Sequence, residues 1–354
     1  MNGWSYYYDQ MTEDEKLAYR IICDGLHRHK EAIKVMIYPE MKLKYPTYIY
    51  DKVLDDNPIF FYVNRYCVRH TQQNCELTIY PKYLYSFTEA RMMIEKIHNA
   101  ADPVIQRALE YKNDPFKMEL FLHNSVVKSV AYDYEAAARA GEGHNAHSII
   151  GTFIDTKAVC DGISRAFKLL CDSVGLPCLV VAGYADDKGI FPKDSLHAWN
   201  LVNIDGQWYH VDVTWDAMEL IYSGGKQSEH HFMFDYFNLT TEDIAVDHRP
   251  MEPIPLCTAK EDNYFYRRGK YANTYDDMLR IIEQQIDSDK IRIRIDCGES
   301  AVEINGAKQK QLVTGNFENR ILDALHEVQR KRKTTHRYSY YWNERIGVMN
   351  LYKI

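Results

Sequence analysis

The sequence lacks the features that mark secreted or membrane-embedded proteins. Its 354 residues contain no run of about 18 apolar side chains, so no membrane-spanning helix is predicted. The start, MNGWSYYYDQMTEDEK, has no basic segment followed by an apolar core, so we expect no signal peptide. The eight cysteines include no CxxC pair and form no disulfide framework, which is typical of a reducing compartment. We therefore expect a cytoplasmic protein.

The sequence also lacks an excess of positive charge. Lysine and arginine number 43 against 50 aspartates and glutamates, and the formal net charge of −7 gives no basic footprint for nucleic acid. Apolar residues make up 46% and charged residues 26% of the chain, which is ordinary for a globular protein. At this length the chain can form two or three domains with a sizeable core. We expect no nucleic-acid partner.

The most informative stretch runs from Gly151 to Asp216, and its first part predicts a helix over Asp161–Val174. Gly175 is placed as a C-terminal cap, and the proline two residues later forbids continuation. Cys160 therefore lies at the helix N-terminus, where free N–H groups and the positive end of the helix dipole favour a reactive thiolate. The apolar positions recur with helical spacing on one face, at Ile163, Ala166, Phe167, Leu170 and Val174.

The second part of this stretch predicts a β-hairpin. The runs HAWNLVNI (197–204) and QWYHVDVTWD (207–216) flank Asp205-Gly206, which is a strong two-residue turn signal. A two-residue turn places Asp212 opposite Trp199 and His197 opposite Thr214. His197 and Asp212 then become diagonal neighbours on one face, roughly 7 Å apart at their backbones, so a hydrogen bond between them is feasible.

A cysteine at a helix start, a histidine and an orienting aspartate form the catalytic set of cysteine acyl-transfer enzymes. The segments AVCDGISRAF, GLPCLVVAGYA and LHAWNLVNIDGQWYHVDVTWD resemble the transglutaminase-like superfamily, in particular its bacterial cysteine protease branch, over about residues 115–250. The resemblance implies a papain-like core, in which a helix carrying the cysteine packs on an antiparallel sheet. It also implies Cys160 as nucleophile, His197 as base and Asp212 as orienting residue.

Several other residues invite a functional reading that simpler structural roles explain better. Cys171 and Cys178 are expected as buried core thiols, and His210 as a structural histidine. The three tryptophans at 199, 208 and 215 are expected in the core or in a cleft wall. His144 and His147 lack a second ligand cluster, and His230-His231 would point to opposite faces of an extended segment. We therefore expect no metal and no cofactor.

The expected fold class is α+β, in three parts. Residues 1–112 are predicted as an N-terminal α+β region, residues 113–250 as the transglutaminase-like catalytic core, and residues 258–354 as a small C-terminal α/β sandwich. The C-terminal order of elements is predicted as β-α-β-α-β-β, beginning with a strand over Asn263–Arg268. A basic run over Arg330–Lys333 is expected to complement the dipole of the helix that it ends.

Capping boxes predict where the N-terminal helices begin. Thr12 to Glu15 is expected to open a first helix, and Ser86 to Glu89 a second one that runs towards Ala100. Pro103 is then predicted to start a separate helix, because proline is favoured at the first helical position. Residues 59–63 are predicted as a strand.

Taken together, these features predict a cysteine-dependent acyl-transfer enzyme with a protein or peptide substrate. The backbone N–H of Cys160 is one expected oxyanion donor, and a papain-type glutamine shortly before the cysteine is absent. Hydrolysis of a peptide bond is favoured over transfer to an amine, as in a transglutaminase. A binding module that retains the three residues without using them is the alternative from another class.

Overall fold

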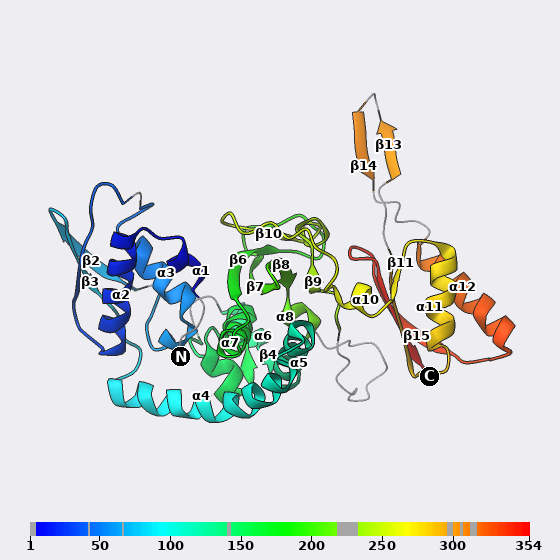
Figure 1. The fold of residues 1–354 in the computed structure, drawn as a ribbon, viewed down its shortest axis with the longest axis horizontal. Helices are drawn as coiled ribbons and strands as arrows, with labels where there is room; N and C mark the ends of the chain where they lie inside the picture. The colour runs from blue at the N-terminus through cyan, green and yellow to red at the C-terminus, as the bar shows by residue number, and fades with distance from the viewer. Residues whose placement is uncertain are drawn as a thin grey trace.

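The computed structural model describes residues 5–41, 43–65, 67–139, 143–217, 233–295, 300–304, 307–311 and 317–354. Three groups of elements follow one another along the long axis of the molecule, with the central group built around helix α7 (Figure 1). The His230-His231 pair lies outside the described residues.

The N-terminal group packs short helices against a three-stranded antiparallel sheet of order β1-β3-β2. The first predicted capping box is confirmed, since the Thr12 side chain accepts from the Glu15 N–H and the Glu15 carboxylate accepts from the Thr12 N–H. The predicted strand over 59–63 is wrong, because Pro58 opens a 3-10 turn there. The elements are α1 (Tyr6–Asp9), α2 (Glu13–His27), β1 (Ile33–Met36), α3 (Tyr48–Asp56), η1 (Pro58–Phe60), β2 (Arg69–Gln73) and β3 (Glu76–Tyr80).

A single long helix, α4 (Phe87–Ala108), replaces the two helices predicted on either side of Pro103, and the short turn η2 (Leu109–Tyr111) follows it. The capping box at Ser86 is confirmed, but Pro103 lies inside the helix rather than at the start of a new one. Pro103 removes one helical hydrogen bond on the solvent-exposed side. Burial of Ile97 and Ala101 on the opposite side holds the helix together, and α4 runs beneath both the N-terminal and the central group (Figure 1).

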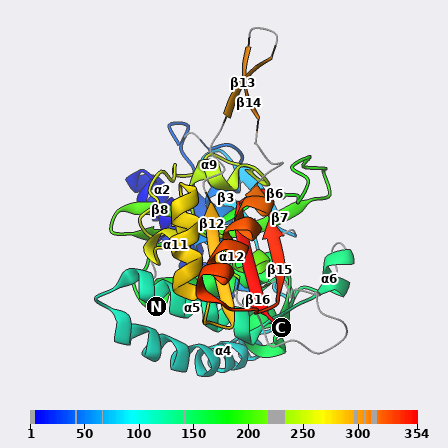
Figure 2. The same ribbon diagram turned by 90° about the vertical axis from the view of Figure 1, so that its right-hand side faces the viewer.

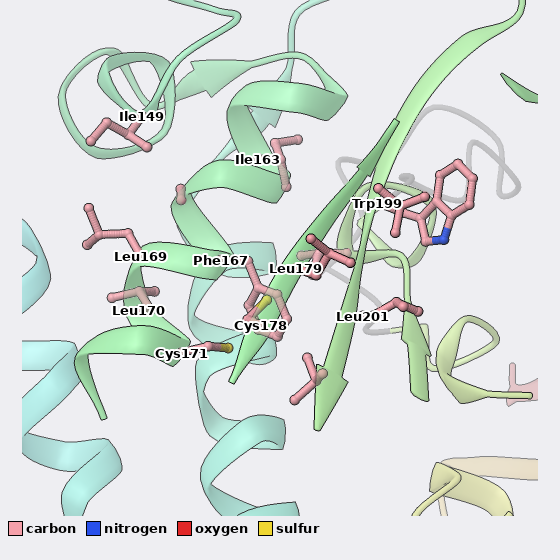
Figure 3. Packing of buried hydrophobic residues seen from close by; sticks show 14 of the residues in the cluster. Ile149, Ile163, Phe167, Leu169, Leu170, Cys171, Cys178, Leu179, Trp199 and Leu201 are labelled. Atoms are coloured by element: carbon pink, nitrogen blue, oxygen red, sulfur yellow. The ribbon is translucent and has the colours of Figure 1, made fainter. Parts of the chain in front are cut away.

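The central group is an antiparallel five-stranded sheet of order β10-β6-β7-β8-β9 with α7 packed on it. The predicted papain-like core is therefore present. Figure 3 shows Phe167, Leu170 and Cys171 of α7 against Cys178 and Leu179 of β6, and both cysteines are buried as predicted. The elements are α5 (Pro115–Ser129), β4 (Ala131–Tyr132), α6 (Tyr134–Ala138), η3 (Gly151–Asp155), β5 (Lys157–Ala158), α7 (Cys160–Ser173), β6 (Cys178–Ala185), β7 (Leu196–Ile204), β8 (Gln207–Val211), α8 (Val213–Asp216), β9 (Phe237–Leu239), α9 (Thr241–Ile244) and β10 (His248–Pro250).

Two buried polar side chains fix α7 relative to the sheet. The Ser164 hydroxyl lies 2.7 Å from the Cys160 carbonyl oxygen and 2.9 Å from the Ala198 carbonyl oxygen on β7. Lys168, fully buried, donates to the Cys178 carbonyl at 2.6 Å. Such contacts hold the start of α7 at a fixed distance from the strand next to it.

The C-terminal group is a mixed sheet of order β11-β12-β16-β15 covered on one face by α11 and α12 (Figure 2). From α11 onward the order of elements is as predicted, apart from an additional hairpin, β13–β14. The predicted strand over Asn263–Arg268 is wrong, because the Asn263 side chain caps a helical turn there. The elements are α10 (Tyr264–Arg267), β11 (Tyr271–Ala272), α11 (Tyr275–Gln285), β12 (Lys290–Ile295), β13 (Ser300–Ile304), β14 (Ala307–Gln311), α12 (Phe317–Arg332), β15 (Tyr338–Asn343) and β16 (Val348–Lys353).

The described residues form two hydrophobic clusters. The first extends from Ala18 to Phe265 and also takes in Ile346 and Val348, and the second is confined to the C-terminal group. The N-terminal and central groups thus share one core, and the boundaries given to the three parts stay predictions. No described helix combines the length and apolar character needed to cross a bilayer.

Candidate active site

Cys160 is the first residue of α7, so its backbone N–H has no partner within the helix. The glycine two residues later explains why the helix can start here. A Cβ at Gly162 would lie 2.2 Å from the carbonyl oxygen of Ala146, which also accepts from the Val159 N–H at 3.0 Å. Only glycine allows this approach, so the C-D-G segment places the thiol at the positive end of the helix dipole.

The hairpin that carries the histidine has the predicted turn and register. Asp205 and Gly206 both have positive φ, at 49° and 87°, as a type I′ turn requires, and the ladder pairs Ile204 with Gln207. The ladder ends at Val211, however, so the predicted pairing of Asp212 with Trp199 is wrong.

The chain leaves the sheet at Asp212 because that side chain caps the short helix α8. Its Oδ1 accepts from the backbone N–H groups of Thr214 and Trp215 at 2.9 and 3.0 Å. This cap turns the chain out of the ladder and leaves Oδ2 of the same carboxylate to bond His197. The contact expected from a diagonal across the sheet is thus made by a helix cap.

The structure brings all three predicted site residues together. His197 Nε2 lies 2.6 Å from Asp212 Oδ2, and Cys160 lies close enough to the same imidazole to help raise its pKa. Because Asp212 occupies Nε2, Nδ1 is the nitrogen left for the thiol. Asp212 is fully buried, the His197 side chain is 8% exposed and Cys160 is half-buried, so the thiol is the outermost of the three.

The electrostatics of the site favour a charged imidazolium. Burial alone would lower the pKa of His197, but the charge and hydrogen bond of Asp212, together with Cys160, raise the pKa to about 10. Burial opposes the carboxylate, yet His197 and His248 hold the pKa of Asp212 well below its usual range. Tyr132 on β4 lies nearby, and burial followed by the charge of Cys160 raises the pKa of its hydroxyl, so it stays protonated.

A second histidine, His248 on β10, also bonds Asp212, and the sequence pattern did not point to it. Its Nε2 lies 3.0 Å from the same Oδ2 that bonds His197, and its Nδ1 lies 2.6 Å from Asp247. His248 stands 36 residues beyond Asp212, on the far edge of the sheet, so no local spacing signals the contact. The adjacent Asp247-His248 dipeptide was the one sequence feature that could have suggested a buried ion pair.

Three further histidines have structural partners. His210 is buried and accepts from the Trp199 indole N–H at 3.0 Å, and burial lowers its pKa to about 3, so the structural role predicted for it fits. His123 is buried against Asp216 at 3.1 Å. His147 pairs with Asp161 at 2.9 Å, and that hydrogen bond raises its pKa.

A cavity of about 70 Å³ opens beside the first turn of α7. Residues of the N-terminal group and of the central group line it, and among the latter is Asp161, which follows Cys160. Its charged or titratable lining side chains are Arg65, His144, His147, Asp161 and Arg165.

Only one set of three side chains in the described part of the chain has metal-ligand spacing, namely His197, Asp212 and His248. The potential ligand atoms are engaged with one another, because both histidine Nε2 atoms bond the same aspartate oxygen at 2.6 and 3.0 Å. These three side chains therefore form a hydrogen-bonded network.

Residues 103–213 match the family model of the transglutaminase-like superfamily. This segment holds the three predicted site residues and is a transglutaminase-like domain, as the sequence motifs predict.

Two curated animal proteins are similar to part of this chain. The chain is 32% identical over 156 residues to the Kyphoscoliosis peptidase of Homo sapiens, a match that covers 40% of this chain and 23% of that protein. It is 30% identical over 110 residues to the Lim and transglutaminase domain protein ltd-1 of Caenorhabditis elegans, covering 25% and 15%. The match thus spans less than a quarter of either relative. Both are eukaryotic, so the expected bacterial branch is not borne out.

Solved structures with similarity include the crystal structure of a TGase, at 18% identity and a TM-score of 0.27, covering 57% of this chain and 56% of that one. The periplasmic domain of TgpA from Pseudomonas aeruginosa, bound to ethylmercury, has 15% identity and a TM-score of 0.27, covering 42% and 65%.

Proposed function

We propose that this protein is a cysteine peptidase that hydrolyses peptide or amide bonds through a thioester on Cys160. One observation carries the proposal: Cys160, at the start of α7, lies beside His197, whose Nε2 is 2.6 Å from Asp212. Thiol, imidazole and carboxylate in this order are the nucleophile, the proton carrier and the orienting group of acyl transfer.

The proposed reaction has two halves. The Cys160 thiolate attacks the carbonyl carbon of the substrate, and the Cys160 N–H donates to the oxygen that becomes negative. As the C–N bond breaks, the His197 imidazolium gives its proton to the leaving amine. A water molecule then attacks the thioester while His197 takes its proton, which releases the carboxylic acid and restores the ion pair. Asp212 stays ionised and keeps the imidazole in one orientation throughout.

The substrate class that fits best is a protein or peptide. The cavity beside α7 lies between the N-terminal and central groups, so an extended chain that crosses Cys160 could place one side chain in it. The seven described cysteines are free thiols, which supports a reducing compartment such as the cytoplasm as the place of action.

Amine transfer, as in a transglutaminase, is the same-class alternative. It shares the first half of the reaction and replaces water with a lysine amine, which must reach the thioester through an apolar channel. Trp199 would be a natural wall of such a channel, but it is fully buried and stacked over His197, with ring centroids 6.2 Å apart. Because Trp199 is a core residue, it is not free to line a channel for an amine, and hydrolysis is favoured.

The decisive experiment has two arms. The protein is incubated with a random peptide library, and separately with a glutamine-containing protein and a labelled primary amine. We expect peptide cleavage that disappears in Cys160→Ala, with the same far-UV circular dichroism in both proteins. Amine incorporation without cleavage would replace the peptidase with a transglutaminase.

A substrate-independent test accompanies it, because a wrong peptide would also give no cleavage. A substoichiometric thiol alkylator near neutral pH should modify Cys160 first among the cysteines and faster than it modifies the same residue in His197→Ala. Equal rates in the two proteins, together with silence in both assays, would favour a binding module that retains the three residues without catalysis.

A further inference from the structure

The candidate site contains a fourth buried group that contacts its aspartate, and this group comes from a different strand. His248 on β10 and His197 on β7 flank β6, which pairs with both strands. Gly183 and Ala185 of β6 lie between the two rings on the same face, where a larger side chain would separate them. A Cβ at Gly183 would already lie 2.6 Å from the Trp199 ring. The G-Y-A segment therefore leaves room for the histidines to meet at Asp212.

Asp212 uses all of its hydrogen-bonding capacity in this arrangement. Oδ1 accepts from the Thr214 and Trp215 N–H groups, and Oδ2 accepts from His197 and His248. A carboxylate offers about four acceptor positions, and here all four are filled by donors from three elements. Any rotation of the Asp212 carboxylate relative to His197 would therefore also break its hydrogen bond with His248.

The protons on His248 follow from counting donors. Asp212 is ionised and only accepts, so His248 Nε2 must carry a proton. Nδ1 faces Asp247 at 2.6 Å, so one further proton lies between these two groups. The second oxygen of Asp247 accepts from the Tyr236 hydroxyl at 2.7 Å, which fixes the carboxylate in turn. The ring of His248 is thus held at both nitrogens.

The surroundings of His248 make this orientation rigid. Its side chain has no solvent exposure, and its ring lies 4.5 Å from that of Trp215 and 5.0 Å from that of Trp199. The Tyr236 hydroxyl is also within 3.4 Å of the Asn343 amide, which donates to it from β15 of the C-terminal group. The chain of hydrogen bonds therefore extends from His197 to the C-terminal sheet.

We propose that His248 is a positioning residue of this site, and that Asp247 and Tyr236 hold its ring in the orientation that donates to Asp212. The inference rests on the proposed function, since it assigns His248 to the support of the Cys160–His197–Asp212 set. His248 bonds Asp212 through Nε2 and Asp247 through Nδ1. It acts by fixing Asp212 and by stabilising the negative charge that Asp212 offers to the imidazolium.

Three variants separate this role from simple packing. His248→Gln keeps an amide N–H near the position of Nε2 and can still donate to Asp212, whereas His248→Phe keeps the ring volume but has no donor. Tyr236→Phe removes only the hydroxyl that holds Asp247. His210→Gln is the matched control, because His210 is also a buried histidine against Trp199 but does not contact Asp212.

The readout is the pH dependence of Cys160 alkylation by iodoacetamide, with the site mapped by mass spectrometry and folding checked by circular dichroism. The titratable groups facing His248 are His197, His210, Asp212, Tyr236 and Asp247. With a donor lost, Asp212 is held less firmly and is more readily protonated, so the acid limb of the profile should move up by about one pH unit in His248→Phe. That shift lowers the rate at mildly acidic pH about tenfold.

His248→Gln and His210→Gln should keep the wild-type profile, and Tyr236→Phe should move it in the same direction as His248→Phe. A wild-type profile in His248→Phe, or an impaired His248→Gln beside an intact His248→Phe, would overturn the proposal. If His248→Phe does not fold, Tyr236→Phe decides in its place, and a wild-type profile there overturns it. His197→Ala is measured alongside: if it matches wild type, the proposed function itself has failed, whereas dependence on His197 without dependence on His248 refutes only this inference.

Discussion

Two histidine–aspartate pairs lie at opposite ends of the same short helix, α8, and they have different surroundings. Asp212 precedes the helix and bonds His197 at 2.6 Å, while Asp216 ends it and bonds His123 at 3.1 Å. The second pair has no solvent exposure. His123 packs against the rings of Phe234 and Phe237, whereas His197 contacts a half-buried thiol.

The comparison teaches that an imidazole–carboxylate pair is not by itself a site. Asp216 accepts from the Tyr236 N–H as well as bonding His123, and burial raises its pKa above the usual range. Asp212 has its pKa lowered by two histidines. The His123–Asp216 pair joins α5 to α8 within the core, and the His197–Asp212 pair places a negative charge next to the imidazole that lies beside Cys160. Variants of matching residues in the two pairs can therefore separate stability from reactivity.

The largest expected effect is the loss of the proton carrier. His197→Gln should reduce turnover by up to about a million-fold, since members of such a set act as a unit. His123→Gln is the matched change in the other pair and should leave turnover per folded molecule within a few-fold of wild type. The measurement is peptide cleavage normalised to the folded fraction. Equal losses in both variants would mean that the two pairs do not differ as proposed.

Matched substitutions of the two aspartates should also affect turnover differently, and the loss of turnover should be smaller than in His197→Gln. Asp212→Asn should reduce turnover by about ten-thousand-fold, because the amide favours the wrong imidazole tautomer. Asp216→Asn should instead lower the free energy of unfolding by about 1–3 kcal/mol through a weakened buried hydrogen bond, with little change in turnover. Urea unfolding and cleavage rates are measured on both proteins. An active Asp212→Asn would make that residue a plain helix cap.

The position of the thiol relative to the His197–Asp212 pair can be tested with Gly162 in the first turn of α7 and Gly175 just beyond its C-terminal cap. Gly162→Ala should shift the start of the helix away from Ala146 and slow Cys160 alkylation about tenfold to a hundredfold. Gly175 is the control, because it has φ of +83° and open space around it. Gly175→Ala should cost about 1–2 kcal/mol of stability and leave the thiol reactivity unchanged. Unchanged alkylation in Gly162→Ala would show that the helix start tolerates the added Cβ.

The smallest expected effect is a change of stability with pH. The pKa of His197 is raised to about 10, above an unfolded value of about 6.5, so its contribution is complete below pH 6.5 and is lost as the pH rises towards 10. The difference in unfolding free energy between wild type and His197→Gln should therefore shrink between pH 6.5 and pH 10. Urea titrations across this window measure it, and a constant difference would contradict the raised pKa.

Much of the site could be predicted from the sequence, because interactions between neighbouring residues determine it. The apolar stripe after Cys160, the αL glycine at 175 and the Asp205-Gly206 turn each depend on a few neighbouring residues, and all three appear as predicted. The C-terminal order of helices and strands from α11 onward, apart from the β13–β14 hairpin, followed from the same local periodicity. The position of Pro103 inside α4 did not follow from local periodicity, because burial of the opposite helix face outweighs a local preference for a break.

Contacts between distant segments were decided only by the tertiary structure. The hairpin register predicted that His197 and Asp212 meet, yet the contact arises because Asp212 leaves the ladder to cap α8. His248 reaches Asp212 across a strand, and His123 reaches Asp216 across 93 residues. Sequence periodicity specifies which face of an element is apolar. It does not specify which polar groups meet inside the fold, because that depends on how sheet, helix and loop pack together to satisfy buried charges.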